Sequence, residues 1–260
     1  MTVFWGLMIP LAGTTLGSAC VFFLKDKLNE LLQKGLLGFA SGVMVAASVW
    51  SLLIPSMDMT AGMGRLAFVP AAAGMLLGMA FLLGMDRVIP HLHLGTQEAE
   101  GPKTSLKKTT MLVLAVTLHN IPEGMAVGVV YAGYLAGNTQ ISAAAAMALS
   151  LGIAIQNFPE GAAVSVPLRR EGYSRRRSFL LGQASGLVEP VSGVIGALLV
   201  VTVEAILPYA LAFAAGAMIL VAVHELIPEC QQNQKEQPYC ATMGIILGFA
   251  VMMLLDVMLG

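Results

Sequence analysis

Eight apolar stretches, each long enough to cross a bilayer as a helix, constrain this sequence more than any other feature. A crossing helix needs about 20 residues. Only 11% of the chain is charged, whereas soluble domains average about 25%. Open strands cannot span lipid with unpaired backbone groups, and the alternation of a β-barrel is missing, so the stretches are predicted as helices. Residues 1–260 are therefore expected to form one all-α, polytopic transmembrane domain, with spans at 3–23, 35–56, 67–90, 108–132, 140–167, 177–201, 206–227 and 240–259.

The basic residues predict how these spans are oriented. Of the 14 Lys and Arg, only Arg65 falls outside the first, third, fifth and seventh connections and their borders. Under the positive-inside rule those connections face the cytoplasm and both termini lie outside it. The first basic residue is Lys25, which follows the first span, so we expect that span to be retained rather than cleaved as a signal peptide. The run Arg175–Arg177 is assigned to topology and to lipid contact, and no nucleic-acid partner is expected.

Two pairs of segments resemble each other across the chain. "FASGVM" (39–44) matches "FAAGAM" (213–218), and "GMLLGMAFLLGMD" (74–86) matches "GIILGFAVMMLLD" (244–256). The second span starts on the cytoplasmic side and the seventh on the outside, so the copies are inverted in the membrane. Inverted repeats are typical of secondary transporters, which hold their substrate near the midplane. With the fourth and fifth spans between the copies, the sequence predicts a 3+2+3 arrangement of eight helices.

A polar motif occurs twice in the central spans, as "HNIPEG" (119–124) and "QNFPEG" (156–161). Side chains four positions apart share a helix face, so the first residue of each motif is expected beside its glutamate. Each proline removes a backbone N–H and frees a carbonyl, which is tolerated at membrane depth where a cavity satisfies the backbone. At about 1.5 Å per residue, both motifs and Glu189 of the sixth span lie roughly 14–18 Å from the cytoplasmic end, near the midplane.

Three carboxylates at that depth need a counter-charge. An ionised side chain at the bilayer centre costs at least about 2.5–3.5 kcal/mol, and no Lys or Arg lies within two turns of any of the three. Carboxylate, amide and imidazole donors suit a divalent cation of borderline hardness. One tetrahedral ion cannot use this many ligand donors. The residues could instead hold two ions, with Glu123 and Glu160 bridging between them. The candidate ligands are His119, Asn120, Glu123, Gln156, Asn157, Glu160 and Glu189.

These two motifs, together with "GLVEP" (186–190) and "HELIPE" (224–229), resemble the ZIP (Zrt/Irt-like) metal transporters. Within this family, the Gln that opens the second motif resembles the residue found there in the GufA-like bacterial branch. The resemblance spans all eight predicted helices. It implies uptake of a divalent metal into the cytoplasm across a bacterial inner membrane, with Zn²⁺ the usual substrate and Cd²⁺, Fe²⁺ or Mn²⁺ as alternatives. It also implies an elevator-like movement of the first, fourth, fifth and sixth helices against the others. No organic cofactor is expected, and a homodimer is one possible oligomeric state.

The resemblance further implies two adjacent metal sites. The first would use His119, Glu123, Gln156 and Glu160, and the second Asn120, Glu123, Asn157, Glu160 and Glu189. Members of this branch carry Asp at the position of Asn157, so the neutral amide is expected to weaken the second site. Other polar residues near the cytoplasmic side are interpreted either as an exit route or as structural pairs and caps; they are Asp86, His91, His93, His224, Glu225 and Glu229.

Other classes of membrane protein fit the sequence less well. A zinc protease needs two histidines in H-E-x-x-H, but "HELIP" has no second histidine, and the chain has only four histidines in all. We therefore expect no enzyme. The main alternative is a proton-coupled carrier or a cation channel that uses the same glutamates, although protons do not require paired amide and imidazole ligands.

Overall fold

The computed structural model describes residues 3–24, 29–92, 100–232 and 239–259, and most of them are helical. Within these ranges the β-type pairing is a single bridge between His91 and Glu100. The predicted site residue His93 and the predicted cytoplasmic lysines Lys25, Lys27 and Lys235 lie outside the described residues. The α-helices are α1 (Val3–Ala19), α2 (Glu30–Ala47), α3 (Ile54–Met59), α4 (Phe68–Val88), α5 (Lys108–Leu135), α6 (Ala143–Arg170), α7 (Arg175–Gly186), α8 (Val188–Thr202), α9 (Leu207–Val221), α10 (Ile227–Gln231) and α11 (Cys240–Leu259). Short 3-10 helices are η1 (Cys20–Phe22), η3 (Ala61–Leu66) and η4 (Glu204–Ile206), and π-helices are η2 (Ser48–Leu53) and η5 (Ala222–Leu226).

Seven helical segments of the described chain are long and apolar enough to cross a membrane. They also expose large apolar side chains that water would disfavour: Leu76 of α4 is 61% exposed and Leu198 of α8 is 60% exposed. The protein is therefore an integral membrane protein. The helix α6 is also long enough to cross, but its polar residues, among them Gln156, Asn157 and Glu160, lower its hydropathy. The eighth crossing stays a prediction. The seven segments are Val3–Phe22, Glu30–Met59, Phe68–Val88, Lys108–Leu135, Arg175–Thr202, Glu204–Gln231 and Cys240–Leu259.

Three of the predicted spans contain interruptions that the sequence analysis did not predict. The sixth span consists of α7 and α8, which meet at Leu187. The second and seventh spans pass through η2 and η5, each of which leads into an Ile-Pro pair. Because Pro55 and Pro228 have no N–H to donate, the regular α-helical ladder cannot run through these points. Such π-helical turns are frequent at functional sites.

The helices pack most closely in four pairs: α1 with α6, α2 with α11, α4 with α9, and α5 with α8. Small residues allow the backbones to approach. A Cβ added to Gly13 of α1 would overlap the backbone of Ala154 in α6, and one added to Gly128 of α5 would overlap Gly193 in α8. The segments that resemble each other in sequence thus exchange partners, because α4 packs on α9 and α11 packs on α2.

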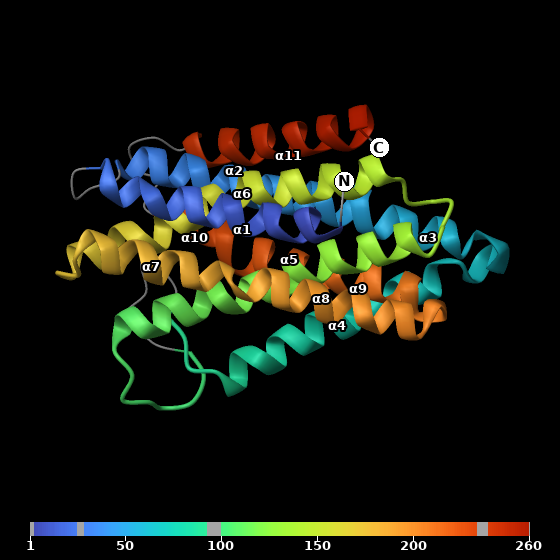
Figure 1. Cartoon of the computed structure of the whole chain (residues 1–260), viewed down its shortest axis with the longest axis horizontal. Coiled ribbons are helices and arrows are strands. Elements are labelled where there is room, and N and C mark those ends of the chain that lie inside the picture. The colour runs from blue at the N-terminus through green and yellow to red at the C-terminus, as the bar shows by residue number, and fades with distance from the viewer. Residues whose placement is uncertain (1–2, 25–28, 93–99, 233–238, 260) are drawn as a thin grey trace.

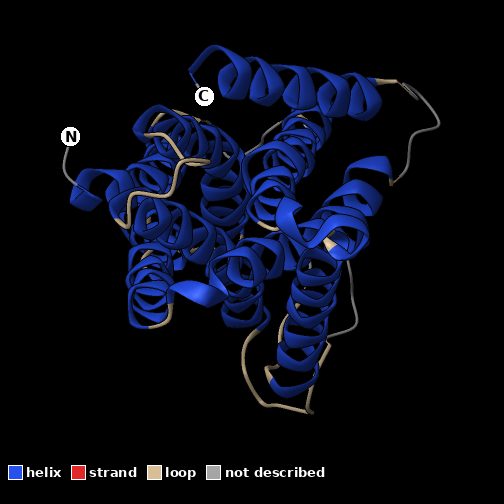
Figure 2. Ribbon diagram, turned by 90° about the vertical axis from the view of Figure 1, so that its right-hand side faces the viewer, coloured by secondary structure: helices blue, strands red, loops and turns tan. Residues whose placement is uncertain are grey.

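The helices run roughly along one direction (Figure 1). The start of α1 and the end of α11 lie at one end of the bundle, while α5 starts at the opposite end. Seen approximately along the helices (Figure 2), the described helices pack side by side as a bundle, and most residues of α5 and α6 are buried in it. This arrangement buries the two helices that carry the polar motifs, and it leaves apolar residues on the outside.

Candidate functional site

The seven predicted ligands are all buried, six of them inside α5 and α6 and the seventh in the first turn of α8. The exposed fraction of their side chains ranges from 0% to 7%. Each belongs to a helix that packs closely against another, so its backbone is held on both sides. They are His119, Asn120 and Glu123 on α5, Gln156, Asn157 and Glu160 on α6, and Glu189 on α8.

The three glutamates form one electrostatic cluster. Glu123 interacts with both Glu160 and Glu189, and Glu160 also interacts with Glu189. Within the described residues, none of the three pairs with a Lys or Arg. Buried charges that are not compensated destabilise a fold by several kcal/mol each. The cluster therefore needs protons or a bound cation.

The shorter side-chain hydrogen bonds among these residues run between helices. Gln156 Nε2 donates to Glu123 Oε1 at 2.6 Å, which links α6 to α5. Asn120 Nδ2 donates to Glu189 Oε1 and to the Ser185 carbonyl, both at 3.1 Å. The helix periodicity predicted that each glutamate would meet the polar residues of its own motif. Instead, crossing helices bring the partner motif closer than the residues one turn away.

Several buried oxygens of the cluster accept no hydrogen bond from any described residue. Both carboxylate oxygens of Glu160 lack a donor, and four other residues of the site have one such oxygen each. Asn157 differs, because its amide accepts weakly from Gln156 at 3.4 Å and donates to the Pro10 carbonyl at 3.4 Å. The oxygens are Asn120 Oδ1, Glu123 Oε2, Gln156 Oε1, Glu160 Oε1 and Oε2, and Glu189 Oε2. Such a set of acceptors without donors is what a cation would complete.

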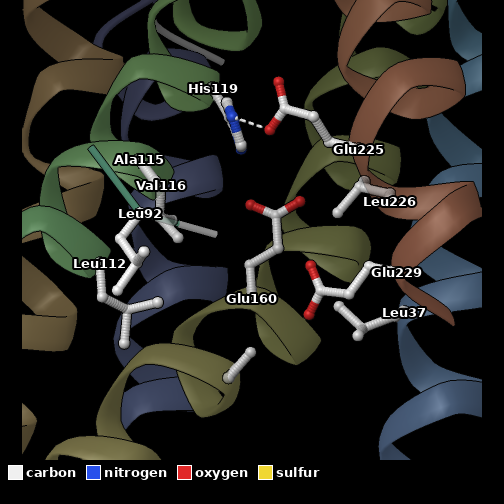
Figure 3. A pocket seen from close by; sticks show the side chains of 11 residues that line it. Leu37, Leu92, Leu112, Ala115, Val116, His119, Glu160, Glu225, Leu226 and Glu229 are labelled. Atoms are coloured by element: carbon white, nitrogen blue, oxygen red, sulfur yellow. Dashed lines mark ion pairs between the residues drawn. The ribbon is translucent and has the colours of Figure 1, made fainter. Parts of the chain in front are cut away.

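His119 is turned away from Glu123. Its Nε2 pairs with Glu225, which comes from η5 (Figure 3). The side chains of Glu160 and Glu229 point into the same small cavity, which holds about 30 Å³ of solvent space. A site needs about 10–15 Å³, measured in this way, to hold a water molecule. The cavity therefore has room for a water or a single ion between His119 and Glu160.

The side chains are not arranged as a preformed metal site in this conformation. Among the described residues, no three His, Cys, Asp or Glu side chains converge closely enough to hold one ion. His119 is engaged by Glu225, and Gln156 is engaged by Glu123. To act as ligands, His119 would have to leave Glu225, and Gln156 would have to turn its amide oxygen toward the glutamates in place of its Nε2.

The predicted exit residues divide between two cavities. Glu225 lies in the cavity beside His119, while His224 lines a second cavity that also contains Asp86 and Glu100. His91 is fully buried, and its Nε2 lies 3.8 Å from Asp86 Oδ1 and 3.9 Å from Glu100 Oε2. Glu100 was not predicted, because its link to His91 depends on the backbone bridge between them.

The first helix contributes residues that the sequence analysis missed. Thr14 of α1 is fully buried, and its Oγ1 donates to Glu189 Oε1 at 2.9 Å. The available signal was the spacing of two hydroxyl residues, Thr14 and Ser18, which lie four positions apart on one face of a helix that has no charged residue.

Comparisons with known proteins find relatives over nearly the whole chain. A model of the family described as "ZIP Zinc transporter" matches residues 97–256. Zinc transporter ZIP11 of Bos taurus is 39% identical, and the alignment covers 98% of this chain and 95% of the relative. Zinc transporter GufA of Myxococcus xanthus is 38% identical, with 96% of each chain covered. Zinc transporter ZIPB of Bordetella bronchiseptica is 39% identical over 96% of this chain and 78% of the relative.

These relatives are named as transporters, which confirms the prediction that the chain is not an enzyme. The family model covers more than half of the chain, and both bacterial relatives extend over nearly all of it. The chain belongs to the ZIP zinc transporter family, in its GufA-like branch.

Proposed function

We propose that this protein carries Zn²⁺ across a bacterial inner membrane into the cytoplasm, through a site formed by α5, α6 and α8. The observation that carries the proposal is the group of buried carboxylate and amide oxygens that accept no hydrogen bond from the described residues. A divalent cation supplies the missing positive charge and completes these acceptors together. The relatives are named zinc transporters, which favours zinc among the divalent ions.

The proposed centre holds two adjacent ions, with Glu160 as the bridge between them. Glu160 has both oxygens available, whereas one oxygen of Glu123 already accepts from Gln156. When Gln156 rotates, Glu123 becomes a second bridge. Asn157 is the weakest donor of the set, because it is neutral and both ends of its amide are engaged. The first ion would take His119, Glu123, Gln156 and Glu160, and the second Asn120, Glu123, Asn157, Glu160 and Glu189.

We further propose that α6 is the eighth crossing and that both termini lie outside the cytoplasm. The length of α6, from Ala143 to Arg170, supports a crossing, and its polar residues face the protein interior rather than lipid. The inverted 3+2+3 repeat is supported by the π-helices η2 and η5, which interrupt matching segments before Ile-Pro, and by the exchanged pairing of α4 and α11.

Transport is proposed to occur by an elevator-type movement. The close pairs α1–α6 and α5–α8 carry the site, while α2–α11 and α4–α9 form the remaining part of the bundle. Backbone contacts at glycines lock the two helices of each pair together. A movement between the two sets would therefore carry the site as a unit without separating its ligands.

Release toward the cytoplasm is proposed to pass from His119 to Glu225 and Glu229. This route is supported by the pair between His119 and Glu225 and by the cavity that Glu229 shares with Glu160 (Figure 3). Asp86, His91 and His224 would form a later station in the neighbouring cavity.

Flux measurements in liposomes test the proposal. Purified wild type and Glu160→Ala are reconstituted, and entry of Zn²⁺, Cd²⁺ and protons is followed; Glu204→Ala, which removes an exposed carboxylate in η4, is the matched control. We expect zinc entry in wild type and in the control, and none above empty liposomes in Glu160→Ala. Undiminished zinc flux in Glu160→Ala would refute the site, and a proton current independent of metal would favour the proton-carrier alternative.

A further inference from the structure

The first helix supports the metal site through one face. The Pro10 carbonyl and the hydroxyls of Thr14 and Ser18 recur at every fourth position, so they lie above one another along α1. Each bonds a different part of the site. Pro10 accepts from Asn157 Nδ2 at 3.4 Å, Thr14 donates to Glu189 Oε1 at 2.9 Å, and Ser18 donates to the Gly161 carbonyl at 3.3 Å.

Thr14 makes the shortest of these three bonds, and its acceptor is the side-chain carboxyl group of Glu189. A threonine within a helix commonly donates to the carbonyl four residues earlier. For Thr14 that acceptor is the Pro10 carbonyl at 3.5 Å, which is 0.6 Å longer than the bond to Glu189 at 2.9 Å. The shorter distance assigns the hydroxyl hydrogen to Glu189.

The bond from Thr14 decides which oxygen of Glu189 remains available. Thr14 and Asn120 both donate to Oε1, and Oε2 accepts nothing from the described residues. Gly186 closes the other side, because a Cβ there would lie 2.9 Å from both Glu189 Oε1 and Thr14 Cβ. Glu189 is thus held in one orientation by groups from α1, α5 and the junction of α7 with α8.

We infer that Thr14 is a positioning residue for the second metal ion, which it serves by holding Glu189 with Oε2 toward the site; the inference rests on the proposed function. Groups that orient a metal ligand in this way affect metal affinity by about 10–100-fold. The second ion is expected to depend on Thr14 especially strongly. Of the ligands that this ion does not share with the first, two are neutral amides and Glu189 is the one carboxylate.

Metal binding to the purified protein in detergent tests the inference without relying on transport. Zn²⁺ is titrated by equilibrium dialysis into wild type, Thr14→Val and Thr14→Ser. Valine keeps the shape of threonine and removes the hydroxyl, whereas serine keeps the hydroxyl. Thr117→Val is the matched control, because the Thr117 hydroxyl donates at 2.7 Å to the Val113 carbonyl of its own helix.

We expect the second equivalent of zinc to bind Thr14→Val about 10–100-fold more weakly, with the first equivalent unchanged. Thr14→Ser and Thr117→Val should bind both equivalents as wild type does. In liposomes, Thr14→Val should raise the zinc concentration for half-maximal flux, and serine should restore it.

Two results would overturn the role of Thr14: wild-type binding of both equivalents by Thr14→Val, or equal weakening in Thr14→Ser. Binding of a single equivalent by wild type would remove the second ion and the inference with it. Failure of the proposed function itself appears separately, as undiminished zinc binding and flux in Glu160→Ala.

Discussion

Gly124 separates two ligand-bearing helices, and we predict that a single methyl group there disables the site. Gly124 follows Glu123 on α5 and faces α8 where Glu189 begins its first turn. A Cβ at position 124 would lie 2.6 Å from the Glu189 Cα and would overlap the Glu189 carbonyl oxygen and Ser192 Oγ. Ordinary contacts of a Cβ begin at 3.4 Å, so α8 would have to retreat by more than 0.8 Å, because the Glu189 carbonyl oxygen lies closer to the added Cβ than the Cα does.

This displacement acts on stability and function at once. Overpacking of this kind costs about 1–3 kcal/mol, because two of the three obstructing atoms belong to the Glu189 backbone, which cannot rotate aside. The retreat also moves Glu189 away from Glu123. Since a misplacement near 1 Å can cost about 100-fold in function, we expect zinc flux in Gly124→Ala to fall by roughly 10–100-fold.

The assay compares Gly124→Ala with Gly84→Ala in zinc flux, zinc affinity and apparent melting temperature. Gly84 lies in α4, and a Cβ there meets no described atom within 4 Å. Alanine is favoured over glycine in a helix by about 1 kcal/mol, so the control should keep full flux and equal or greater stability. Wild-type flux, affinity and melting temperature in Gly124→Ala would refute the contribution of α5–α8 packing to the site.

Two further outcomes follow from the proposed ligands. Asn157→Asp adds a carboxylate beside the second ion, so the affinity of this variant for the second zinc should rise by about tenfold or more in equilibrium dialysis, in contrast to that of Asn157→Ala. Equal affinity in wild type and Asn157→Asp would exclude position 157 as a ligand. Zinc flux should fall as the external pH is lowered from 7 to 5 at constant internal pH, because carboxylate and imidazole ligands bind metal after losing their protons; flux that is unchanged at pH 5 would contradict ligation by these groups.

Residue type and helix periodicity predict much of the arrangement in this protein. The low charge content and long apolar stretches predict helices that span a membrane, and seven such segments are present in the described chain. The motifs at 119–124 and 156–161 predict which side chains lie inside the bundle, because polar residues avoid lipid. The sequence alone thus assigns the proposed ligands to their helices, without any tertiary information.

Helix periodicity does not predict which of these side chains contact one another. Glu123 meets Gln156 rather than His119, and Thr14 meets Glu189, because these contacts depend on how closely the helices cross. The close approach is set by glycines and other small residues, whose effect appears only when both helices are placed. The contact between His119 and Glu225 depends in addition on η5, because Glu225 lies within this π-helical turn and not on a regular α-helix.

The partial satisfaction of the site has a consequence for transport. A cluster whose acceptors were all saturated would have no reason to bind a cation, whereas one with none satisfied would destabilise the fold. Here Gln156 and Thr14 each satisfy one carboxylate oxygen and leave the other available, and Glu160 keeps both. A hydrogen bond to a charged group contributes about 1.5–3 kcal/mol, so an arriving divalent ion can displace Gln156 from Glu123, and the same bond re-forms when the ion leaves. The bond between Gln156 and Glu123 must break when the ion binds, so it weakens metal binding and favours release. A carrier has to release its ion, whereas a permanent metal site does not.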